Sequence, residues 1–360
     1  MKRRADRASL RGGVMFDIDG VLVDVRSSYI DCIRKTVNLY LQKIMLVPAY
    51  AGALLSRDDV NAFKLLGGLN NDWDTVYAIL LYLQAQVEKD PRKWEILSLK
   101  KLRGLLHLKK LANSVPKPCG LAPFKKLIKD QGLISYALAK DMFQENYLGE
   151  KLFAKDEKRP PLFSRAKGLI HLEKLFFAKP LLRELRAMGF DLGIVTGRTR
   201  FEAEYVLKRF GIRKFFKAVV THDDVAAAEK KSGRILRKPH PFPVLACARK
   251  IGPGGRPGPI RPGQLGQAAI RGLVRQARTD GSGRHPRRDH IGQRSFVYVG
   301  DLPDDIRAAN GSKAKIKIVS CGVLYGQDNA REAEREFKKA HADLMIKRPT
   351  DLLSAVRSER

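Results

Sequence analysis

Residues 13–20 read GVMFDIDG, an apolar run of four residues that passes directly into two aspartates. A short run without polar residues is typical of a buried strand, so Asp17 and Asp19 come where such a strand would end. Similar apolar runs recur later in the chain, and amphipathic patterns that end in glycine predict helices at 179–189 and 201–211. The further predicted strands are 190–195, 217–222, 295–300 and 316–326. Strands that alternate with helices predict an α/β protein with a doubly wound, Rossmann-like parallel sheet.

The spacing of these strands predicts an inserted domain. About 170 residues separate the first strand from the second, whereas a crossover between parallel strands needs only about 10–12 residues. Helical periodicity runs through the excess, so we expect an all-helical cap domain at 26–177 and a discontinuous core formed by 1–25 and 178–360. Within the core, residues 252–294 are rich in Gly, Pro, Gln and Arg and contain no Lys. That composition predicts a disordered insert.

The composition limits the class of protein. With 44% hydrophobic residues the chain can bury sizeable cores, which excludes a wholly disordered protein. No run approaches the roughly 18–20 apolar residues that a membrane span needs. The basic start MKRRADRASLRGG is not followed by the apolar segment of a secretory signal, so we do not expect secretion. Four cysteines without a CxxC pair indicate a reducing compartment, and we expect a cytoplasmic protein.

The net charge of the chain is +31, from 69 Lys and Arg against 38 Asp and Glu. Such a charge favours polyanions, including nucleic acid, and also small acidic metabolites. The alternative is a solvated basic surface. That interpretation is favoured because the charge is spread along the chain and forms no single stripe with interleaved aromatic residues. Nucleic acid is therefore a possible partner but not the expected one.

Polar side chains follow several predicted strands at their carboxyl ends, where a parallel sheet places its ligand site. Converging carboxylates repel one another unless a cation lies among them, and all-oxygen ligands suit Mg²⁺. A hydroxyl and amides at a helix start suit phosphate oxygens, and a nearby lysine can neutralise charge on both partners. The groups concerned are Asp17, Asp19, Thr196, Gly197, Lys238, Asp301, Asp304 and Asp305. Together they predict a site for an anionic phosphoryl group.

The segments that carry these groups match a known pattern. MFDIDGVLVD, IVTGRTR, RKPHPFPVL and YVGDLPDDIRAA resemble, in order, the four motifs of the haloacid dehalogenase superfamily. The resemblance extends over residues 14–356, apart from 252–294. A helical insertion between the first and second motifs implies a C1-capped member, such as a phosphoglycolate phosphatase. The segments GGLNNDWD at 67–74 and FQENYLGEKLF also resemble parts of a phosphoglycolate-phosphatase-like subgroup.

The resemblance implies a catalytic role for three residues. Asp17 would be the nucleophile that attacks phosphorus and becomes an aspartyl-phosphate. Asp19 would protonate the leaving alkoxide and then activate water for the second half-reaction. Lys238 would bridge the nucleophile and the phosphoryl group.

The same resemblance implies the groups that bind metal and phosphate. Mg²⁺ would be held by the Asp17 carboxylate, the Asp19 backbone carbonyl and Asp301, with Asp305 or Asp304 placing a metal-bound water. Thr196 and Gly197, with Lys238, would bind phosphate.

Three positions depart from the usual motifs or leave a choice. Leu302 follows Asp301 where Thr or Ser is usual, and His240 stands where Asp would be commoner. Lys230 and Lys231 are near Lys238, but RKPHP fits the motif because proline follows Lys238 directly.

The expected function is that of a Mg²⁺-dependent phosphatase acting on a small phosphorylated metabolite, of a phosphoglycolate-like or sugar-phosphate-like kind. Asp19 favours phosphoryl over halide chemistry, because a halide leaves without a proton. Two alternatives stay open: a phosphomutase of the same superfamily, and a basic nucleic-acid-binding protein that keeps the scaffold for structure.

Five further residues are candidate substrate contacts. Asn70, Asn71, Asp72 and Trp73 could reach a substrate from a loop of the cap, or could cap the helix that follows them. Arg198 could contact substrate or begin a helix.

Overall fold

The computed structural model describes residues 12–47, 54–64, 66, 69, 71–88, 120–130, 132–252, 294–327 and 329–358. The chain divides into two compact units, one formed by Met1–Asp24 with Leu175–Arg360 and the other by Val25–Lys174. Two short strands, β2 (Val23–Asp24) and β3 (Lys174–Leu175), lie where the chain passes from one unit to the other. The predicted insert at 252–294 lies outside the described residues except for its two ends.

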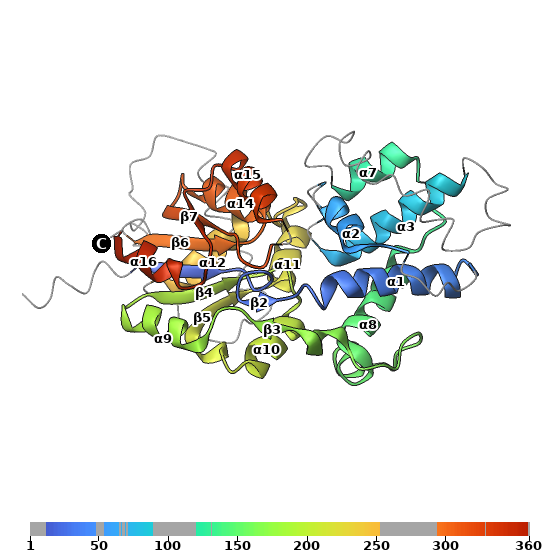
Figure 1. The fold of residues 1–360 in the computed structure, drawn as a ribbon, viewed down its shortest axis with the longest axis horizontal. Helices are drawn as coiled ribbons and strands as arrows, with labels where there is room; N and C mark the ends of the chain where they lie inside the picture. Colours follow the sequence, from blue (N-terminus) through green and yellow to red (C-terminus); the bar gives the residue numbers. More distant parts are fainter. Residues whose placement is uncertain are drawn as a thin grey trace, which may run out of the picture. The chain divides into compact units, whose positions relative to one another are not determined.

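The discontinuous unit is built on a six-stranded parallel sheet (Figure 1). Its strands, in spatial order, are β5 (Phe216–Val220), β4 (Asp191–Val195), β1 (Gly13–Phe16), β6 (Ser295–Gly300), β7 (Lys317–Val323) and β8 (Leu344–Ile346). The central strand β1 pairs with β4 and β6, and Phe16 is in register with Ile194 and Val299. The residues that follow these three strands therefore meet at one edge of the sheet. The α/β fold with a parallel sheet and a helical insertion confirms the predicted fold class.

Helices cover the sheet, which explains why its strands are continuous apolar runs. Val14, Met15 and Phe16 have no exposed surface. Helix α12 (Phe242–Ile251) packs against β1, β4 and β5, and α14 (Pro303–Ser312) packs against β6 and β7. The other helices of this unit are α9 (Lys179–Ala187), α10 (Arg200–Arg209), η3 (Arg213–Phe215), α11 (His222–Ser232), α15 (Ala330–Lys339) and α16 (Asp351–Ser358).

The inserted unit is helical in its described residues. Helix α3 (Asp72–Glu88) contacts the four other α-helices that the structure describes in this unit, and every side chain at 73–84 is buried. A helix that is apolar on all sides is stable only in such a central position. The surrounding elements are α1 (Tyr29–Lys43), α2 (Arg57–Lys64), α7 (Leu121–Ile128), α8 (Tyr136–Glu157) and η2 (Leu169–Leu172).

Among the described residues, no helix combines the length and apolar character that a membrane crossing would require.

Candidate active site

The turn that follows β1 forms one side of the candidate site. The Asp17 N–H donates to the Val299 carbonyl at 2.9 Å, and the Asp17 Oδ1 accepts the Ile18 N–H at 2.7 Å. The chain then reverses at Gly20, whose φ of +69° favours glycine. A Cβ at Gly20 would lie 2.2 Å from the Asp301 Oδ2, so glycine is also required by the close approach of that carboxylate.

Lys238 joins two of the acidic groups. Its Nζ donates to the Asp17 Oδ2 at 2.9 Å and to the Asp305 Oδ1 at 2.7 Å. These partners are 221 and 67 residues away in the sequence. Lys238 therefore lies at the predicted place beside the first-strand aspartate, whereas Lys230 and Lys231 belong to α11.

Asp305 is fixed by three donors. Besides Lys238, the Tyr298 hydroxyl donates to its Oδ1 at 2.8 Å, and the Leu302 N–H donates to its Oδ2 at 3.1 Å. The last residue of β6, Gly300, makes room for this side chain, because a Cβ there would lie 2.1 Å from the Asp305 Cβ. Asp305 thus anchors both the lysine and the first turn of α14.

The electrostatics of the cluster are dominated by burial. Burial raises the pKa of Asp17 to about 7, and the charges of Asp305 and Asp19 add to the rise while Lys238 opposes it. Burial, with the charges of Asp305 and Asp17, also raises the pKa of Asp301 well above its ordinary value. Burial alone would lower the pKa of Lys238, but the two carboxylates override it and raise that pKa well above its usual range. One lysine does not compensate the acidic charge that gathers here.

The acidic residues fit a divalent cation. Carboxylate oxygens of Asp17, Asp301 and Asp305 all lie within 4.8 Å of one another. In the part of the chain that the structure describes, no side-chain hydrogen bond or ion pair satisfies the Asp301 carboxylate. A crowded set of oxygen ligands with uncompensated negative charge suits a hard cation such as Mg²⁺. The Asp19 carboxylate and Asp304 lie outside this group, and Asp304 pairs instead with Arg307 at 2.8 Å.

The loop after β4 carries the predicted phosphate-binding residues. The Thr196 N–H donates to the Val220 carbonyl at 3.0 Å, and the Thr196 Oγ1 accepts the Arg198 N–H at 3.2 Å. Thr196 is buried and Gly197 is exposed. The loop ends at the capping box of α10, formed by Thr199 and Glu202. Because β4 pairs in register with β1, this loop and Asp17 lie at the same edge of the sheet.

Arg198 does more than begin a helix. Its buried guanidinium pairs with Asp19, which lies 179 residues earlier in the chain.

The candidate contacts in the helical unit have partners within that unit. The Asn71 Oδ1 accepts the Asp74 N–H at 2.6 Å, which is the geometry of a helix N-cap. Asp72 pairs with Lys64 at 2.8 Å, and the buried Trp73 donates its Nε1–H to Gln144 at 3.3 Å. Asn70 lies outside the described residues. A contact between any of these residues and a substrate stays a prediction.

Sequence reasoning did not find Tyr298, the buried hydroxyl beneath the site. Its strand was predicted, and a tyrosine inside an otherwise apolar run was the available signal. A buried phenol needs a hydrogen-bond partner, and here that partner is Asp305.

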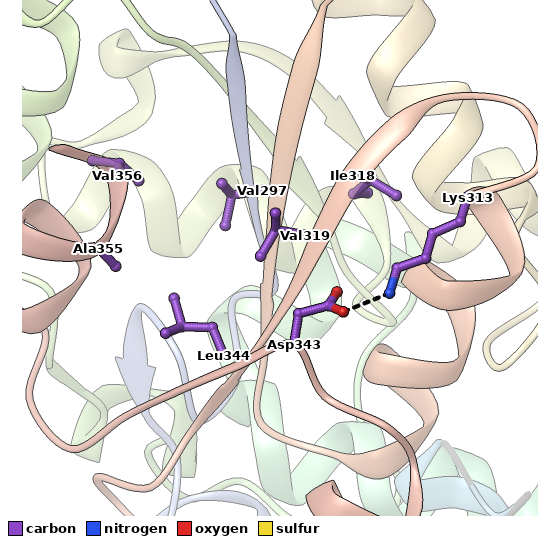
Figure 2. Close-up of a pocket in the computed structure, with 8 residues that line it drawn as sticks. All are labelled: Val297, Lys313, Ile318, Val319, Asp343, Leu344, Ala355 and Val356. Carbon is purple, nitrogen blue, oxygen red and sulfur yellow. Dashed lines mark hydrogen bonds and ion pairs between the residues drawn. The ribbon is translucent and has the colours of Figure 1, made fainter. Parts of the chain in front are cut away.

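A cavity of about 420 Å³ elsewhere in the same unit is lined by none of the predicted site residues. Figure 2 shows Val297 and Val319 of the sheet, Ala355 and Val356 of α16, and the ion pair between Lys313 and Asp343 at 2.7 Å. The other lining residues are Ile318 and Leu344.

The family model of haloacid dehalogenase-like hydrolases matches residues 12–260 of this chain. The chain belongs to this family. The match includes Asp17, Thr196 and Lys238 but ends before β6, so Asp301 and Asp305 join the site through the fold rather than through the matched stretch.

Three curated relatives of this chain are phosphatases, and each match covers only part of both proteins. Glyceraldehyde 3-phosphate phosphatase of Methanopyrus kandleri is 26% identical over 56% of this chain and 66% of its own length. Phosphoglycolate phosphatase of Escherichia coli is 25% identical over 46% of this chain and 48% of its own length. Pyrophosphatase PpaX of Oceanobacillus iheyensis is 38% identical over 20% of this chain and 29% of its own length. The chain thus spans less than two thirds of the length of each of these relatives.

Two solved structures share the fold. A crystal structure from the Northeast Structural Genomics Consortium has a TM-score of 0.61 and 22% identity, and the match covers 96% of this chain and 98% of the other. A phosphatase from Thermococcus thioreducens has a TM-score of 0.52 and 18% identity, and the match covers 90% and 98% of the two chains.

Proposed function

We propose that this chain is a C1-capped, Mg²⁺-dependent phosphatase that hydrolyses a small phosphorylated metabolite through an aspartyl-phosphate. The proposal is carried by one observation: Asp17 follows the central strand, is bonded to Lys238, and lies with Asp301 and Asp305 in one group of carboxylates. A cluster of this charge costs stability unless a cation joins it, and that cost is typical of a functional site.

In the first half-reaction, an Asp17 carboxylate oxygen attacks phosphorus and the bond to the leaving oxygen breaks. Asp19 gives its proton to that oxygen, so the product departs as an alcohol. Lys238 neutralises negative charge shared by Asp17 and the phosphoryl oxygens. Mg²⁺ held by Asp17, Asp301 and Asp305 would supply further neutralisation of the phosphoryl group.

In the second half-reaction, Asp19 takes a proton from a water molecule as the water oxygen attacks phosphorus. The bond between phosphorus and the Asp17 oxygen breaks, which releases inorganic phosphate and restores the Asp17 carboxylate. The Thr196 hydroxyl accepts the Arg198 N–H, so its own proton can be donated to a phosphate oxygen. The Gly197 backbone, exposed in the loop, offers a second donor.

The proposed substrate class is supported by the curated relatives. The curated relatives include phosphatases named for phosphoglycolate and for glyceraldehyde 3-phosphate, both small phosphate esters. A cap that closes over the phosphoryl group limits the size of the leaving group and excludes water. We assign the helical unit this role, with Asn70, Asn71, Asp72 and Trp73 as candidate contacts to the leaving group.

The test is phosphate release from a panel of phosphorylated metabolites and from p-nitrophenyl phosphate, measured in Mg²⁺ and in EDTA. We expect Mg²⁺-dependent release from a small phosphate ester, loss of that release in Asp17→Asn, and no loss in the control variant Asp343→Asn. Full activity of a folded Asp17→Asn variant would overturn the proposal. An isomerised product without free phosphate would identify a phosphomutase instead.

A further inference from the structure

The contact between Arg198 and Asp19 links two segments of the candidate site. The Arg198 side chain has no exposed surface, and its Nε and Nη2 both donate to the Asp19 Oδ1, at 2.8 and 2.5 Å. The Asp19 side chain is 27% exposed. A fully buried guanidinium therefore holds one oxygen of a carboxylate whose side chain is itself partly exposed.

The guanidinium is itself held in a fixed loop. The Arg198 N–H donates to the Thr196 Oγ1 at 3.2 Å, and the Arg198 carbonyl accepts the His222 N–H at 2.9 Å. Both ends of this residue are thus tied, one of them to the hydroxyl that we assign to phosphate binding. The arrangement sets the position of Asp19 relative to the phosphate loop.

The hydrogen-bond pattern separates the two oxygens of Asp19. Over the described residues, the hydrogen bonds that its carboxylate accepts all reach Oδ1. Oδ2 is therefore the oxygen that can carry a proton toward a leaving group. Because Arg198 is buried, the guanidinium is placed to act through Asp19 rather than to contact a substrate.

We propose that Arg198 is a positioning residue that orients Asp19 for both proton transfers, an inference that rests on the proposed phosphatase function. In the first step, the proton on Oδ2 passes to the leaving oxygen as its bond to phosphorus breaks. In the second step, Oδ2 takes a proton from the attacking water as the new bond to phosphorus forms and the bond between phosphorus and the Asp17 oxygen breaks. Oδ1 stays bonded to Arg198 throughout, which keeps Oδ2 directed at the leaving-group side.

A comparison of leaving groups tests this role. p-Nitrophenolate departs without a proton, whereas an alkoxide needs one, so only the alkyl ester depends on a well-placed acid. For Arg198→Met, we expect kcat/KM to fall about 100-fold for the alkyl phosphate that the wild type hydrolyses fastest, and by less than about 5-fold for p-nitrophenyl phosphate. Arg198→Lys keeps the charge but loses the planar fork, and should fall between Met and the wild type on the alkyl ester.

Arg200→Met is the matched control. Arg200 lies two residues further along the same segment and pairs with Asp224 at 2.7 Å, away from Asp19. We expect this variant to hydrolyse both esters at the wild-type rate. Circular dichroism of each variant, with its thermal transition, reports whether it is folded, and Arg198→Lys provides the measurement if Arg198→Met does not fold.

The double variant with Asp19→Asn completes the test. If Arg198 acts through Asp19, Arg198→Met should cost less than about 3-fold more on the alkyl ester once Asp19 is already Asn. Equal losses on both esters, or full additivity with Asp19→Asn, would overturn the role of Arg198 while leaving the phosphatase intact. A wild-type chain that releases no phosphate from any ester would overturn the proposed function, and the role of Arg198 with it.

Discussion

Acidic groups at the two ends of the parallel sheet have different surroundings: those at the carboxyl end are buried beside one another, whereas Asp343 at the amino end is partly exposed. At the amino end of β8, Asp343 accepts hydrogen bonds from Lys313 at 2.7 Å and from the Ser320 N–H and hydroxyl at 2.8 Å each. Although partial burial acts against it, these donors lower the pKa of Asp343. At the carboxyl end, Asp17 and Asp301 lie against another carboxylate, and burial raises the pKa of both.

The contrast separates a structural carboxylate from the carboxylates of the proposed active site. Asp343 is satisfied by its own chain, and its ionised form stabilises the fold beside the cavity of Figure 2. The carboxyl-end cluster has one lysine for three carboxylates and is costly without a further cation. Substitutions at the two ends should therefore have opposite consequences for activity and stability.

The largest expected effect is on turnover. Asp301→Asn removes a charge from the proposed Mg²⁺ site, so kcat in saturating substrate and Mg²⁺ should fall about 1,000-fold. Asp343→Asn, the same change at the other end of the sheet, should keep kcat within about 2-fold of the wild type. Steady-state phosphate release measures both, and an equal loss in the two variants would remove the distinction between the ends.

The next effect is a pH dependence of stability. The folded-state pKa of Asp17 is about 7, against an ordinary value of 3.8, so the folded protein binds this proton more tightly than the unfolded chain does. The contribution of the protonated Asp17 to the free energy of unfolding is complete below about pH 4 and is lost as the pH rises toward 7. In EDTA, Asp17→Asn should gain stability over the wild type by about 1 kcal/mol per pH unit across that range and then level off. Urea unfolding at several pH values gives this difference, and a gain that is flat with pH would argue against a buried, crowded Asp17.

A smaller effect concerns the sign of two stability changes. In EDTA at pH 8, Asp301→Asn relieves repulsion and should raise the Tm by about 3 °C. Asp343→Asn loses charge-assisted bonds at a carboxylate that is about one third exposed, and should cost about 1 kcal/mol and lower the Tm. Thermal denaturation of both variants and the wild type measures these two Tm changes. Two changes of the same sign would contradict the proposed difference between the carboxylates at the two ends of the sheet.

The smallest effect tests the helical unit. Asn71→Ala removes the cap of α3 and should cost about 1 kcal/mol of stability, while Asn71→Ser keeps a capping oxygen and should cost less. Substrate titrations then separate the two roles of Asn71. A KM that rises in both variants would indicate a substrate contact, and an unchanged KM with a loss confined to the alanine variant would leave a cap alone.

Much of the fold could be predicted because the sheet is covered on its faces. Strands β1 and β6 appear in the sequence as unbroken apolar runs, and the predicted ranges 13–16 and 295–300 agree with the structure. β8 was missed because it is only three residues long and shows no periodicity of its own. Lys238 and Asp301 are 63 positions apart in the sequence, with the residues 253–293 between them. The Arg294 Nη1 donates to the Ile251 carbonyl at 3.2 Å, so the described residues on the two sides of 253–293 lie next to each other.

The site could be predicted only in part. Residue types and strand ends indicate which groups gather, since the register of β1 with its neighbours sets the edge where they meet. They do not indicate which hydrogen bonds form. Three features of the site depend on side-chain directions that packing sets. They are which of Asp304 and Asp305 faces Lys238, the hydrogen bonds from Arg198 to Asp19, and the role of Tyr298. Asp305 is the third residue of α14, which turns it toward Lys238 while Asp304 turns to Arg307.

The most direct measurement is detection of the phosphoryl group on Asp17. The wild-type chain is mixed with its best substrate in Mg²⁺, quenched in acid within one turnover, and digested for mass spectrometry. We expect phosphate on the peptide that contains Asp17, none in EDTA, and none in Asp17→Asn. Rapid Mg²⁺-dependent hydrolysis with no phosphate on that peptide at any quench time, and with Asp17→Asn still active, would contradict the central claim that Asp17 is the nucleophile.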